Sequence, residues 1–336
     1  MENFRVGVVG CGGIAQVHGT VLQHLEGVEL VGCADIKPER AQAFAETYGG
    51  RAYRSMEELL EHEQLDAVHL CTPHYLHTPM AKLAASRGLH VFTEKPPVMT
   101  WEQWAEFRQL EQAPTRVGVC FQNRYNPSVQ LLREVLASGK AGKVLGARGF
   151  VTWHREAPYY TESGWRGSLQ TEGGGVLINQ SIHTLDLLGQ FLGRATQVEA
   201  SMMNHHLKGV IEVEDMMEAY LTFGEAHAIF YATTAYCADS PVLVELACEN
   251  ATIRMEEQEV SITWADGSKE RHSLTSKPVA GGKAYWGNSH GLCIQDFYRC
   301  VREGKPFRND IAGIADTAEL MLSMYQSARE HTVVEL

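Results

Sequence analysis

Two short segments of the sequence carry side chains whose types and spacing suit the oxidation of an alcohol. The first is Thr93-Glu94-Lys95-Pro96-Pro97, which directly follows a predicted strand. The two prolines stiffen the backbone after Lys95 and so hold its ammonium in place. A lysine held in this way can hydrogen-bond an alcohol oxygen and stabilise the alkoxide that forms as a hydride leaves. From the residues alone, a surface lysine paired with Glu94 is an equally good interpretation.

The second segment runs from Glu172 to Asp186 (EGGGVLINQSIHTLD) and enters a predicted helix. On a helix, Asn179 and His183 lie four residues apart and share a face, while leucines occupy the packed side. A histidine with a pKa near neutrality suits removal of a hydroxyl proton. A histidine satisfied by a neighbour at a domain interface explains the spacing equally well. Asp186, one turn further on, is expected to orient or pack rather than react.

The elements that would position these groups begin with a glycine turn near the N-terminus. A predicted strand over residues 4–9 is followed by Gly10-Cys11-Gly12-Gly13-Ile14-Ala15, a helix over residues 16–25 and a strand over residues 28–34. This G-x-G-x-x-A pattern between strand and helix is typical of a dinucleotide site, with the pyrophosphate at the helix N-terminus. We therefore expect Gly10, Gly12, Gly13 and Ile14 to bind the cofactor. A purely structural strand-to-helix turn is the alternative.

Asp35 stands at the end of the second strand, where a carboxylate meets the adenosine ribose of a dinucleotide. A carboxylate there accepts hydrogen bonds from two hydroxyls but repels a 2′-phosphate. The sequence therefore favours NAD over NADP as the cofactor. Lys37 and Arg40 could soften this preference, although exposed charges at the start of the next helix explain them better.

Several histidines raise the question of a metal site: His74 with His77, His205 with His206, and His290. None has a carboxylate or cysteine neighbour at a recognised ligand spacing, so no metal is expected. His74 and His77 follow the predicted strand at residues 66–71, at the edge where open α/β sheets bind ligands. Contact with the nicotinamide half of a cofactor or ordinary packing are the two interpretations of that pair.

Composition excludes several functional classes. The chain has 336 residues, enough for two domains, and a net charge of −12 without a basic cluster, which disfavours nucleic acid and anionic membranes as partners. No apolar stretch is long enough to span a bilayer, and the first strand begins too early to leave room for a signal peptide. The eight cysteines form no C-x-x-C pair. These features predict a reduced, cytoplasmic protein.

The order of elements predicts an α/β fold with two domains. Strands and helices alternate to about residue 122, which indicates a dinucleotide-binding Rossmann domain with a doubly wound parallel sheet over residues 1–122. Over residues 123–336 several strands are joined by turns, which predicts a substrate-binding and oligomerisation domain with a large, mostly antiparallel sheet. Because too few helices remain to cover both faces, we expect an open apolar face that forms a homodimer or homotetramer.

The glycine turn, Asp35, CTPHYLHTP (residues 71–79), EKPP (residues 94–97) and the GGG-x-x-x-N-x-x-x-H-x-x-D helix occur in the same order as in the Gfo/Idh/MocA oxidoreductases. The sequence resembles this family over essentially its whole length, including a C-terminal helix at residues 315–329. The resemblance implies a Rossmann domain and an α/β domain with an open sheet, with the C-terminal helix packing back on the first domain. It also implies oxidation of a ring hydroxyl of a sugar or cyclitol by a dimer or tetramer.

The resemblance implies roles for individual residues as well. Lys95 and His183 match the family's catalytic lysine and histidine. Cofactor contacts are expected from Thr72, Pro73, His77, Glu94, Lys95, Trp165 and Arg166. Members similar to inositol dehydrogenase carry an aspartate where this chain has Asn179. An amide cannot take a proton, so a lysine–aspartate–histidine relay is interrupted, His183 remains the base candidate, and Asn179 is left to fix a substrate hydroxyl.

We therefore expect NAD-dependent oxidation of a ring hydroxyl of a sugar, sugar derivative or cyclitol, with acid–base assistance from Lys95 and His183. One alternative is a glycoside-cleaving enzyme of the same fold that retains NAD and uses transient redox chemistry. The other is a non-catalytic, NAD-responsive binding protein. The side chains expected to line a substrate cleft, or else to lie at an interface, are Trp153, His154, Arg155, Tyr159, Tyr160, Tyr285 and Trp286.

Overall fold

The computed structural model describes residues 3–274 and 289–336 of the chain, so Tyr285 and Trp286 lie outside the described residues. The chain divides into two compact units, which we call unit one and unit two. Unit one comprises Met1–Gln122 and Pro278–Ile314, and unit two comprises Asn123–Lys277 and Ala315–Leu336. The expected boundary at residue 122 coincides with the end of the first segment of unit one.

Unit one contains a six-stranded sheet in the order β3-β2-β1-β4-β5-β6, in which every pair of neighbours is parallel. The strands are β1 (Phe4–Val9), β2 (Val28–Ala34), β3 (Arg51–Tyr53), β4 (Ala67–Leu70), β5 (His90–Thr93) and β6 (Val117–Val119). The helices between them are α1 (Gly13–His24), α2 (Pro38–Tyr48), α3 (Met56–His62), α4 (His74–Ser86) and α5 (Trp101–Arg108), with the short 3-10 helix η1 (Gln109–Gln112) after α5. The Rossmann prediction is confirmed.

The strand order places the candidate loops side by side. The order reverses between β1 and β4, and ligands of open α/β sheets bind at the carboxyl ends of the strands at such a switch point. The loops that follow β2, β1, β4 and β5 are therefore neighbours at one sheet edge. They carry Asp35, the glycine turn, Thr72-Pro73 and Glu94-Lys95 respectively.

Helix α9 (His290–Glu303) belongs to unit one although it is remote from the Rossmann strands in sequence. Phe297 on this helix packs against Phe92 of β5 with ring centroids 5.2 Å apart, and it also packs against Phe307. The backbone N–H of Val119 donates to the Asn309 carbonyl at 2.9 Å. Sequence analysis assigned this segment to the second domain. The structure groups it with unit one because it covers apolar side chains near β5 and β6.

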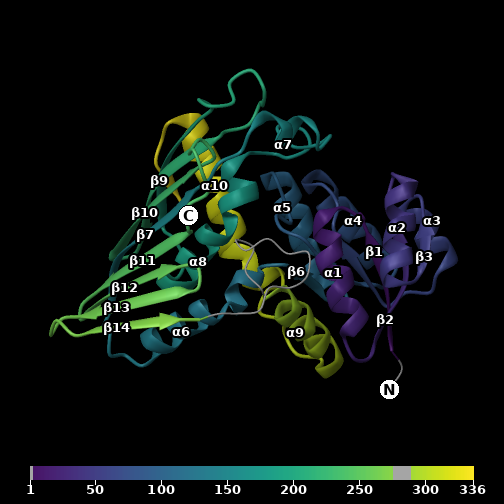
Figure 1. Cartoon of the computed structure of the whole chain (residues 1–336), viewed down its shortest axis with the longest axis horizontal. Helices are drawn as coiled ribbons and strands as arrows, with labels where there is room; N and C mark the ends of the chain where they lie inside the picture. The colour runs from purple at the N-terminus through teal and green to yellow at the C-terminus, as the bar shows by residue number, and fades with distance from the viewer. Residues whose placement is uncertain (1–2, 275–288) are drawn as a thin grey trace. The chain divides into compact units, whose positions relative to one another are not determined.

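Unit two contains a nine-stranded sheet in the order β14-β13-β12-β11-β7-β10-β9-β8-β15 (Figure 1). Only β7 and β10 pair in parallel among its described strands, so the prediction of a mostly antiparallel sheet is confirmed. The strands are β7 (Val144–Thr152), β8 (Gln197–Met203), β9 (Met216–Phe223), β10 (Ala226–Thr233), β11 (Leu243–Cys248), β12 (Ala251–Glu256), β13 (Glu259–Trp264), β14 (Lys269–Ser273) and β15 (Val334–Glu335).

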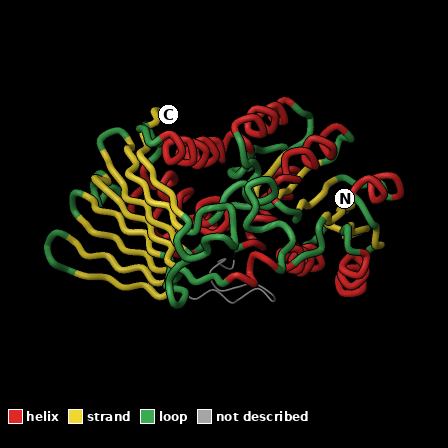
Figure 2. Tube along the Cα trace, turned by 90° about the horizontal axis from the view of Figure 1, so that it is seen from above, coloured by secondary structure: helices red, strands yellow, loops and turns green. Residues whose placement is uncertain are grey.

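The helices of unit two are α6 (Pro127–Ala137), α7 (Ala157–Thr161), α8 (Ile182–Leu192) and most of α10 (Ile311–Glu330), with a π-helix over Val176–Ser181 before α8 and the 3-10 helix η2 (Gln122–Tyr125) before α6. Helix α8 contacts β7 and β10 of this sheet. Figures 1 and 2 show α8 and α10 on one face and no described helix of this unit on the other. The C-terminal helix expected at residues 315–329 begins four residues earlier in the structure, at Ile311.

Residues of the sheet alternate between the covered and the open face. In β9 the side chains of Met217, Leu221 and Phe223 are buried, whereas Tyr220 is 45% exposed. Its register neighbour in β10, Ile229, is 46% exposed. Large apolar side chains therefore stand on the open face, as the sequence predicts. No helix in the described part of the chain combines the length and the apolarity needed to cross a membrane.

Candidate functional site

The glycine turn after β1 is shaped by a close backbone approach. Gly10 has a φ of +86°, and a Cβ at this position would lie 2.6 Å from the carbonyl oxygen of Cys71 in the loop after β4. Helix α1 begins at Gly13, and within the described residues no side chain caps its N-terminus and no acid lies in its first turn. A Cβ at Gly12 or Gly13 would meet no atom within 4 Å. The turn therefore presents backbone N–H groups that fit a pyrophosphate.

Asp35 is bound to the same turn. Its Oδ2 accepts a hydrogen bond from the backbone N–H of Cys11 at 2.8 Å, and its Oδ1 accepts one from the N–H of Lys37 at 2.8 Å. The next residue, Ile36, is 87% exposed, and sequence analysis did not single it out. A carboxylate fixed beside the turn and an exposed apolar side chain fit the ribose and the adenine of a dinucleotide. The signal in the sequence was an isoleucine directly after the acid that ends the strand.

His77 joins the two loops that follow β4 and β5. The side chain is fully buried, with Nδ1 2.6 Å from the Pro96 carbonyl oxygen and Nε2 2.8 Å from the Thr72 carbonyl oxygen. Burial lowers the pKa of His77, against the effect of these carbonyls. His77 therefore connects the Thr72-Pro73 loop with the loop that contains Pro96, and this is its contribution to the expected cofactor site. Its ring lies 6.0 Å from that of His74, which is also buried.

Glu94 is held in place directly before Lys95. Its Oε1 lies 3.0 Å from Nε2 of His18 in helix α1, and its Oε2 accepts the backbone N–H of Lys95 at 3.3 Å. Burial by itself raises the pKa of Glu94, but the hydrogen bond with His18 and the charges of His18, His290 and Lys95 lower it well below the ordinary value. Glu94 is therefore an ionised group that fixes the backbone at Lys95.

A line of buried polar side chains extends behind Glu94. His18 Nδ1 lies 2.8 Å from His69 Nδ1, and His69 Nε2 lies 2.8 Å from the Tyr298 hydroxyl. All three side chains are buried. Burial by itself lowers the pKa of His18, but Cys71 and Glu94 raise it to about 10, so His18 is an imidazolium at neutral pH. This hydrogen-bonded series was not predicted, because its members are far apart in the sequence. The one sequence feature that pointed to it is His69, a histidine within an otherwise apolar strand.

Metal-binding potential in the described residues is confined to one buried group. His18, Glu94 and Cys120 offer donor atoms that all lie within 4.8 Å of one another. The imidazole and carboxylate of this group already form an ion pair at 3.0 Å. In the second histidine pair, the backbone N–H groups of His205 and His206 donate to Asp215. The eight cysteines are free thiols.

In unit two the helix that was predicted to follow the three glycines consists of two kinds of helix. Residues Val176–Ser181, including Asn179, form a π-helix, and α8 with His183 follows. A Cβ on Gly174 would lie 2.0 Å from the Tyr325 hydroxyl, and one on Gly175 would lie 1.9 Å from the Glu214 carbonyl oxygen. The glycines are therefore required for close packing at the start of this helix. Asn179 and His183 stand on either side of the junction of the two helix types.

Asp186 serves packing, as expected. Its carboxylate forms a buried ion pair with Arg124, with Arg124 Nε 2.9 Å from Oδ2, and accepts the Thr317 hydroxyl at 2.6 Å. The side chains of Asp186 and Arg124 are almost completely buried. The pair fixes helix α8, which carries His183, to neighbouring elements of unit two.

Aromatic and cationic side chains gather in unit two. The Arg166 guanidinium lies 4.5 Å from the centroid of the Tyr159 ring and 4.8 Å from that of Trp165, and Arg155 lies 5.4 Å from the same Tyr159 ring. Arg155 is also paired with Asp239 at 2.9 Å. The structure thus brings together Trp165 and Arg166 with part of the expected cleft lining.

Two other expected cleft residues, Tyr160 and His154, are engaged by neighbouring residues of unit two. Tyr160 is buried in a small core with Leu207, Ile211 and Val213, so its expected place in a cleft lining is corrected. Its neighbour Tyr159 is partly buried against the same core, and its ring is the one that Arg155 and Arg166 contact. The backbone N–H of His154 donates to the Asp239 carboxylate at 2.8 Å.

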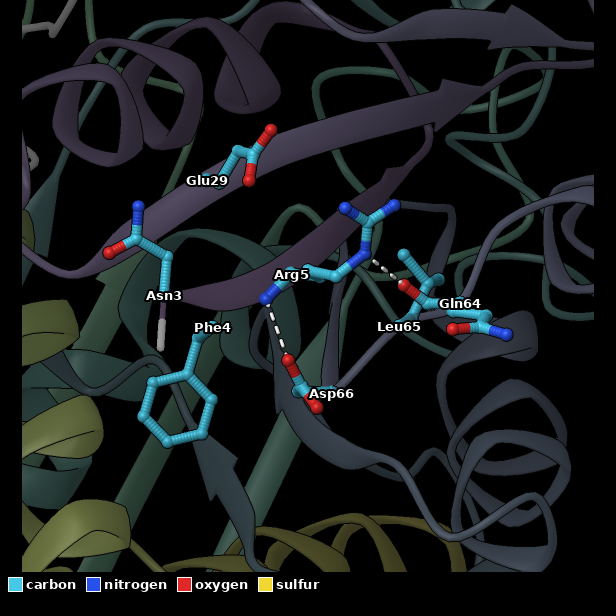
Figure 3. A pocket seen from close by; sticks show the side chains of 7 residues that line it. All are labelled: Asn3, Phe4, Arg5, Glu29, Gln64, Leu65 and Asp66. Atoms are coloured by element: carbon cyan, nitrogen blue, oxygen red, sulfur yellow. Dashed lines mark hydrogen bonds between the residues drawn. The ribbon is translucent and has the colours of Figure 1, made fainter. Parts of the chain in front are cut away.

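Figure 3 shows a hollow at the opposite edge of the Rossmann sheet. Its lining residues lie at the amino ends of β1, β2 and β4: Asn3, Phe4, Arg5, Glu29, Gln64, Leu65 and Asp66. Arg5 fills part of it, because its backbone N–H donates to Asp66 at 2.8 Å and its Nε donates to the Gln64 carbonyl at 2.7 Å. None of the candidate catalytic or cofactor residues lines this hollow.

A Rossmann unit with a glycine turn and an acid at the end of its second strand, joined to a unit with an open sheet, is typical of two-domain dinucleotide-dependent oxidoreductases. Two family models agree with this class. The model described as "Oxidoreductase family, NAD-binding Rossmann fold" matches residues 4–122, and the model described as "GFO/IDH/MocA C-terminal domain" matches residues 129–254. The chain belongs to the Gfo/Idh/MocA family and is an NAD(P)-dependent oxidoreductase acting on CH–OH groups.

Individual relatives agree with this assignment. The chain is 26% identical to the D-glucoside 3-dehydrogenase of Escherichia coli (strain K12), over 99% of this chain and 97% of that protein. It is 28% identical to the glucose-6-phosphate 3-dehydrogenase of Bacillus subtilis (strain 168), a match that spans 49% of this chain and 50% of the relative. The crystal structure of the WlbA dehydrogenase from Bordetella pertussis in complex with NADH and UDP-GlcNAcA superposes with a TM-score of 0.86 at 28% identity, covering 100% and 99% of the two chains.

Proposed function

We propose that this chain oxidises a ring hydroxyl of a sugar, sugar derivative or cyclitol to the ketone, with NAD as the hydride acceptor. The observation that carries the proposal is the shared sheet edge on which Lys95 follows β5, beside the loops with the glycine turn and Asp35. A lysine next to a dinucleotide-binding turn is placed to act on an alcohol oxygen while hydride leaves the neighbouring carbon. Relatives named as dehydrogenases of sugars support the substrate class.

Gly10, Gly12, Gly13 and Ile14 would hold the pyrophosphate, and Asp35 would hold the adenosine ribose. When bound, the nicotinamide supplies a carbon that accepts hydride. The ammonium of Lys95 donates a hydrogen bond to the substrate oxygen and stabilises the alkoxide. His183 accepts the hydroxyl proton, and Asn179 orients a neighbouring hydroxyl.

The choice of NAD over NADP follows from Asp35. Its two carboxylate oxygens are oriented by the N–H groups of Cys11 and Lys37. A carboxylate fixed in this position accepts hydrogen bonds from ribose hydroxyls and repels a 2′-phosphate. Lys37 and Arg40 are exposed and stand at the start of α2.

The test is the pair of variants Lys95→Ala and His183→Ala. Each is expected to lower kcat with a sugar or cyclitol substrate by about 10²–10⁴, the usual contribution of a positioned acid–base group. NAD affinity, measured by calorimetry, is expected to persist largely in both, because the pyrophosphate turn and Asp35 are unchanged and Lys95 is only one of several expected cofactor contacts. A double variant that keeps wild-type turnover rules the proposal out. Stoichiometric NADH accumulation distinguishes a dehydrogenase from an enzyme that cleaves glycosides by transient redox chemistry.

We also propose that the open face of the nine-stranded sheet joins two copies of the chain. Tyr220 and Ile229 stand exposed on this face, and Arg148 forms an ion pair with Glu245 at 2.9 Å on strands of the same sheet. The strand register places Arg148 beside Ile229, and an apolar patch beside an ion pair suits a self-complementary contact. Sedimentation of the purified chain decides the point, because a monomer at micromolar concentration contradicts it.

A further inference from the structure

We propose that Glu172 is a positioning residue whose ionised carboxylate sets the orientation of the Asn179 amide toward the substrate. The inference rests on the proposed function, because it takes Asn179 as a ligand of a substrate hydroxyl. Glu172 directly precedes the three glycines that open the helix with Asn179 and His183. Neither the sequence motifs nor the family resemblance assigned it a role.

Both carboxylate oxygens of Glu172 are bound by donors inside unit two. Oε1 accepts a hydrogen bond from Asn179 Nδ2 at 2.5 Å, and Oε2 accepts one from the backbone N–H of Gly167 at 2.5 Å. The side chain is fully buried. Gly167 directly follows Trp165-Arg166, the pair expected to approach the cofactor. One carboxylate therefore joins the Trp165-Arg166 loop to the side chain of Asn179.

This contact decides which end of the amide faces away from Glu172. The oxygen and nitrogen of an amide project in different directions, so an amide that donates through Nδ2 to Glu172 turns Oδ1 away from it. A carbonyl oxygen only accepts hydrogen bonds, and a sugar hydroxyl can donate one to it. In the ionised state of Glu172, Asn179 thus presents an acceptor, which suits a neighbouring substrate hydroxyl that donates a hydrogen bond to it while His183 takes the proton of the reacting hydroxyl.

Protonation of Glu172 reverses this polarity. A protonated carboxyl carries one O–H donor, and the Gly167 N–H already occupies the other oxygen. The O–H of Glu172 and the NH₂ of Asn179 are then two donors that face one another. This repulsion is removed when the Asn179 amide turns over, so that its Oδ1 accepts a hydrogen bond from the Glu172 O–H. Asn179 then presents NH₂ instead of a carbonyl oxygen on its other side. One proton on Glu172 therefore exchanges an acceptor for a donor.

The surroundings of Glu172 make this exchange accessible near neutral pH. Burial raises the pKa of Glu172 to about 7, against the hydrogen bonds from Gly167 and Asn179 and the charge of Arg166, while the charge of Glu214 adds to the increase. Among the described residues, the hydroxyls of Tyr160 in α7 and Tyr325 in α10 also sense the charge of Glu172. Because the raised pKa belongs to the folded protein, the ionised, acceptor-presenting state predominates above about pH 7.

Glu214 offers a matched control. Glu214 is also a buried carboxylate, and burial raises its pKa. It comes from the segment before β9 and packs against the first residues of the same helix. Its Oε2 accepts the Gly175 N–H at 2.8 Å, and its Oε1 accepts the Leu177 N–H at 3.0 Å and the Tyr325 hydroxyl at 2.9 Å. Glu214 thus binds the backbone of the helix without a hydrogen bond to the Asn179 side chain. Its neutral variant separates helix support from amide orientation.

The first experiment follows the side-chain amide of Asn179 by NMR in asparagine-labelled protein between about pH 5 and pH 9, with Asn179→Ala to assign the signal. The wild-type signal is expected to titrate in the neutral range. In Glu172→Gln this titration is lost, whereas in Glu214→Gln it is retained. A wild-type signal that does not move, or one lost equally in Glu214→Gln, overturns the proposal. The measurement needs no turnover, so it stands even if the chain oxidises no sugar and the proposed function fails.

The second experiment compares pH profiles of kcat/KM. Glu172→Gln is expected to lose about tenfold to hundredfold in kcat/KM at pH 8, the usual effect of losing a hydrogen bond to a charged group. NAD affinity is expected to persist. The decrease of kcat/KM toward acid pH whose midpoint coincides with the titration of the Asn179 amide signal is expected to disappear. Glu172→Asp, which restores an ionisable group, is expected to regain a titrating limb. A Glu172→Gln profile identical to wild type contradicts the proposal.

Discussion

Replacement of His18 by leucine should expose how strongly the buried ion pair with Glu94 supports unit one. Leucine leaves the Glu94 carboxylate buried without its imidazolium, whose Nε2 lies 3.0 Å from Oε1. Removing one member of a buried ion pair typically costs about 3–5 kcal/mol, because an uncompensated charge stays in the interior. We expect a loss of this size in the free energy of opening of unit one, read from amide hydrogen exchange in β1 and β5.

Two further variants separate charge from packing. His18→Leu combined with Glu94→Gln removes the stranded charge and is expected to recover part of the loss. Tyr298→Phe removes only the hydroxyl that lies 2.8 Å from His69 Nε2 at the far end of the line, and about 1 kcal/mol is expected for it. Two results refute the ion-pair argument. One is a His18→Leu protein whose free energy of opening of unit one lies within about 1 kcal/mol of the wild-type value. The other is a double variant whose loss of stability equals the sum of the losses in His18→Leu and Glu94→Gln measured separately.

The pH dependence of this pair follows from the directions of the two shifts. The folded-state pKa of His18 is raised from 6.5 to about 10, so its contribution to stability is complete below pH 6.5 and is lost as the pH rises toward 10. The folded-state pKa of Glu94 is lowered from 4.5, so its contribution is complete above pH 4.5 and is lost at more acidic pH. Wild-type protein should therefore lose stability in unit one above pH 6.5, and His18→Leu should lose much less.

Three other predictions concern the cofactor and the assembly. Gly10→Ala should abolish NAD binding, measured by calorimetry. The added Cβ would lie 2.6 Å from the Cys71 carbonyl oxygen, and the φ of +86° disfavours alanine. Unchanged affinity contradicts the assignment of this turn to the cofactor site. Asp35→Ser should raise the ratio of kcat/KM for NADP to that for NAD by about tenfold or more, since the charge facing a 2′-phosphate is removed, and a constant ratio speaks against Asp35 as the ribose ligand. Ile229→Glu should shift the chain to a monomer in sedimentation velocity, because it places a charge on the open sheet face, while Glu225→Gln at the exposed end of the β9–β10 turn should leave the assembly unchanged.

Local patterns were enough to predict the Rossmann unit. Gly10, Gly12 and Asp35 follow buried strands at short range, and their roles depend on turn geometry and helix ends that neighbouring residues determine. The small number of helices predicted after residue 122 likewise indicated that one face of the second sheet is open. The short strands β3, β14 and β15 were missed, because three or fewer residues or a polar composition give little periodic signal.

The candidate site was predicted residue by residue but not as a network. Lys95, Asn179 and His183 were identifiable from residue type, spacing and resemblance. Their supports were not, because each support comes from another part of the chain: His18 reaches Glu94 across 76 positions, and Tyr298 reaches His69 across 229. Pattern reasoning over a window of residues carries no information about such pairs.

The sequence by itself determined the class of cofactor, the type of sheet in each unit and the side chains available for chemistry, because these depend on local turns, periodicity and residue type. Only the tertiary structure decided that α9 joins the Rossmann unit, that the helix with Asn179 begins as a π-helix, and that Glu94 and Glu172 are bound inside the protein. The physical reason is burial: hydrogen bonds and charges inside a protein must be matched by whichever groups the fold brings near, whatever their separation along the chain.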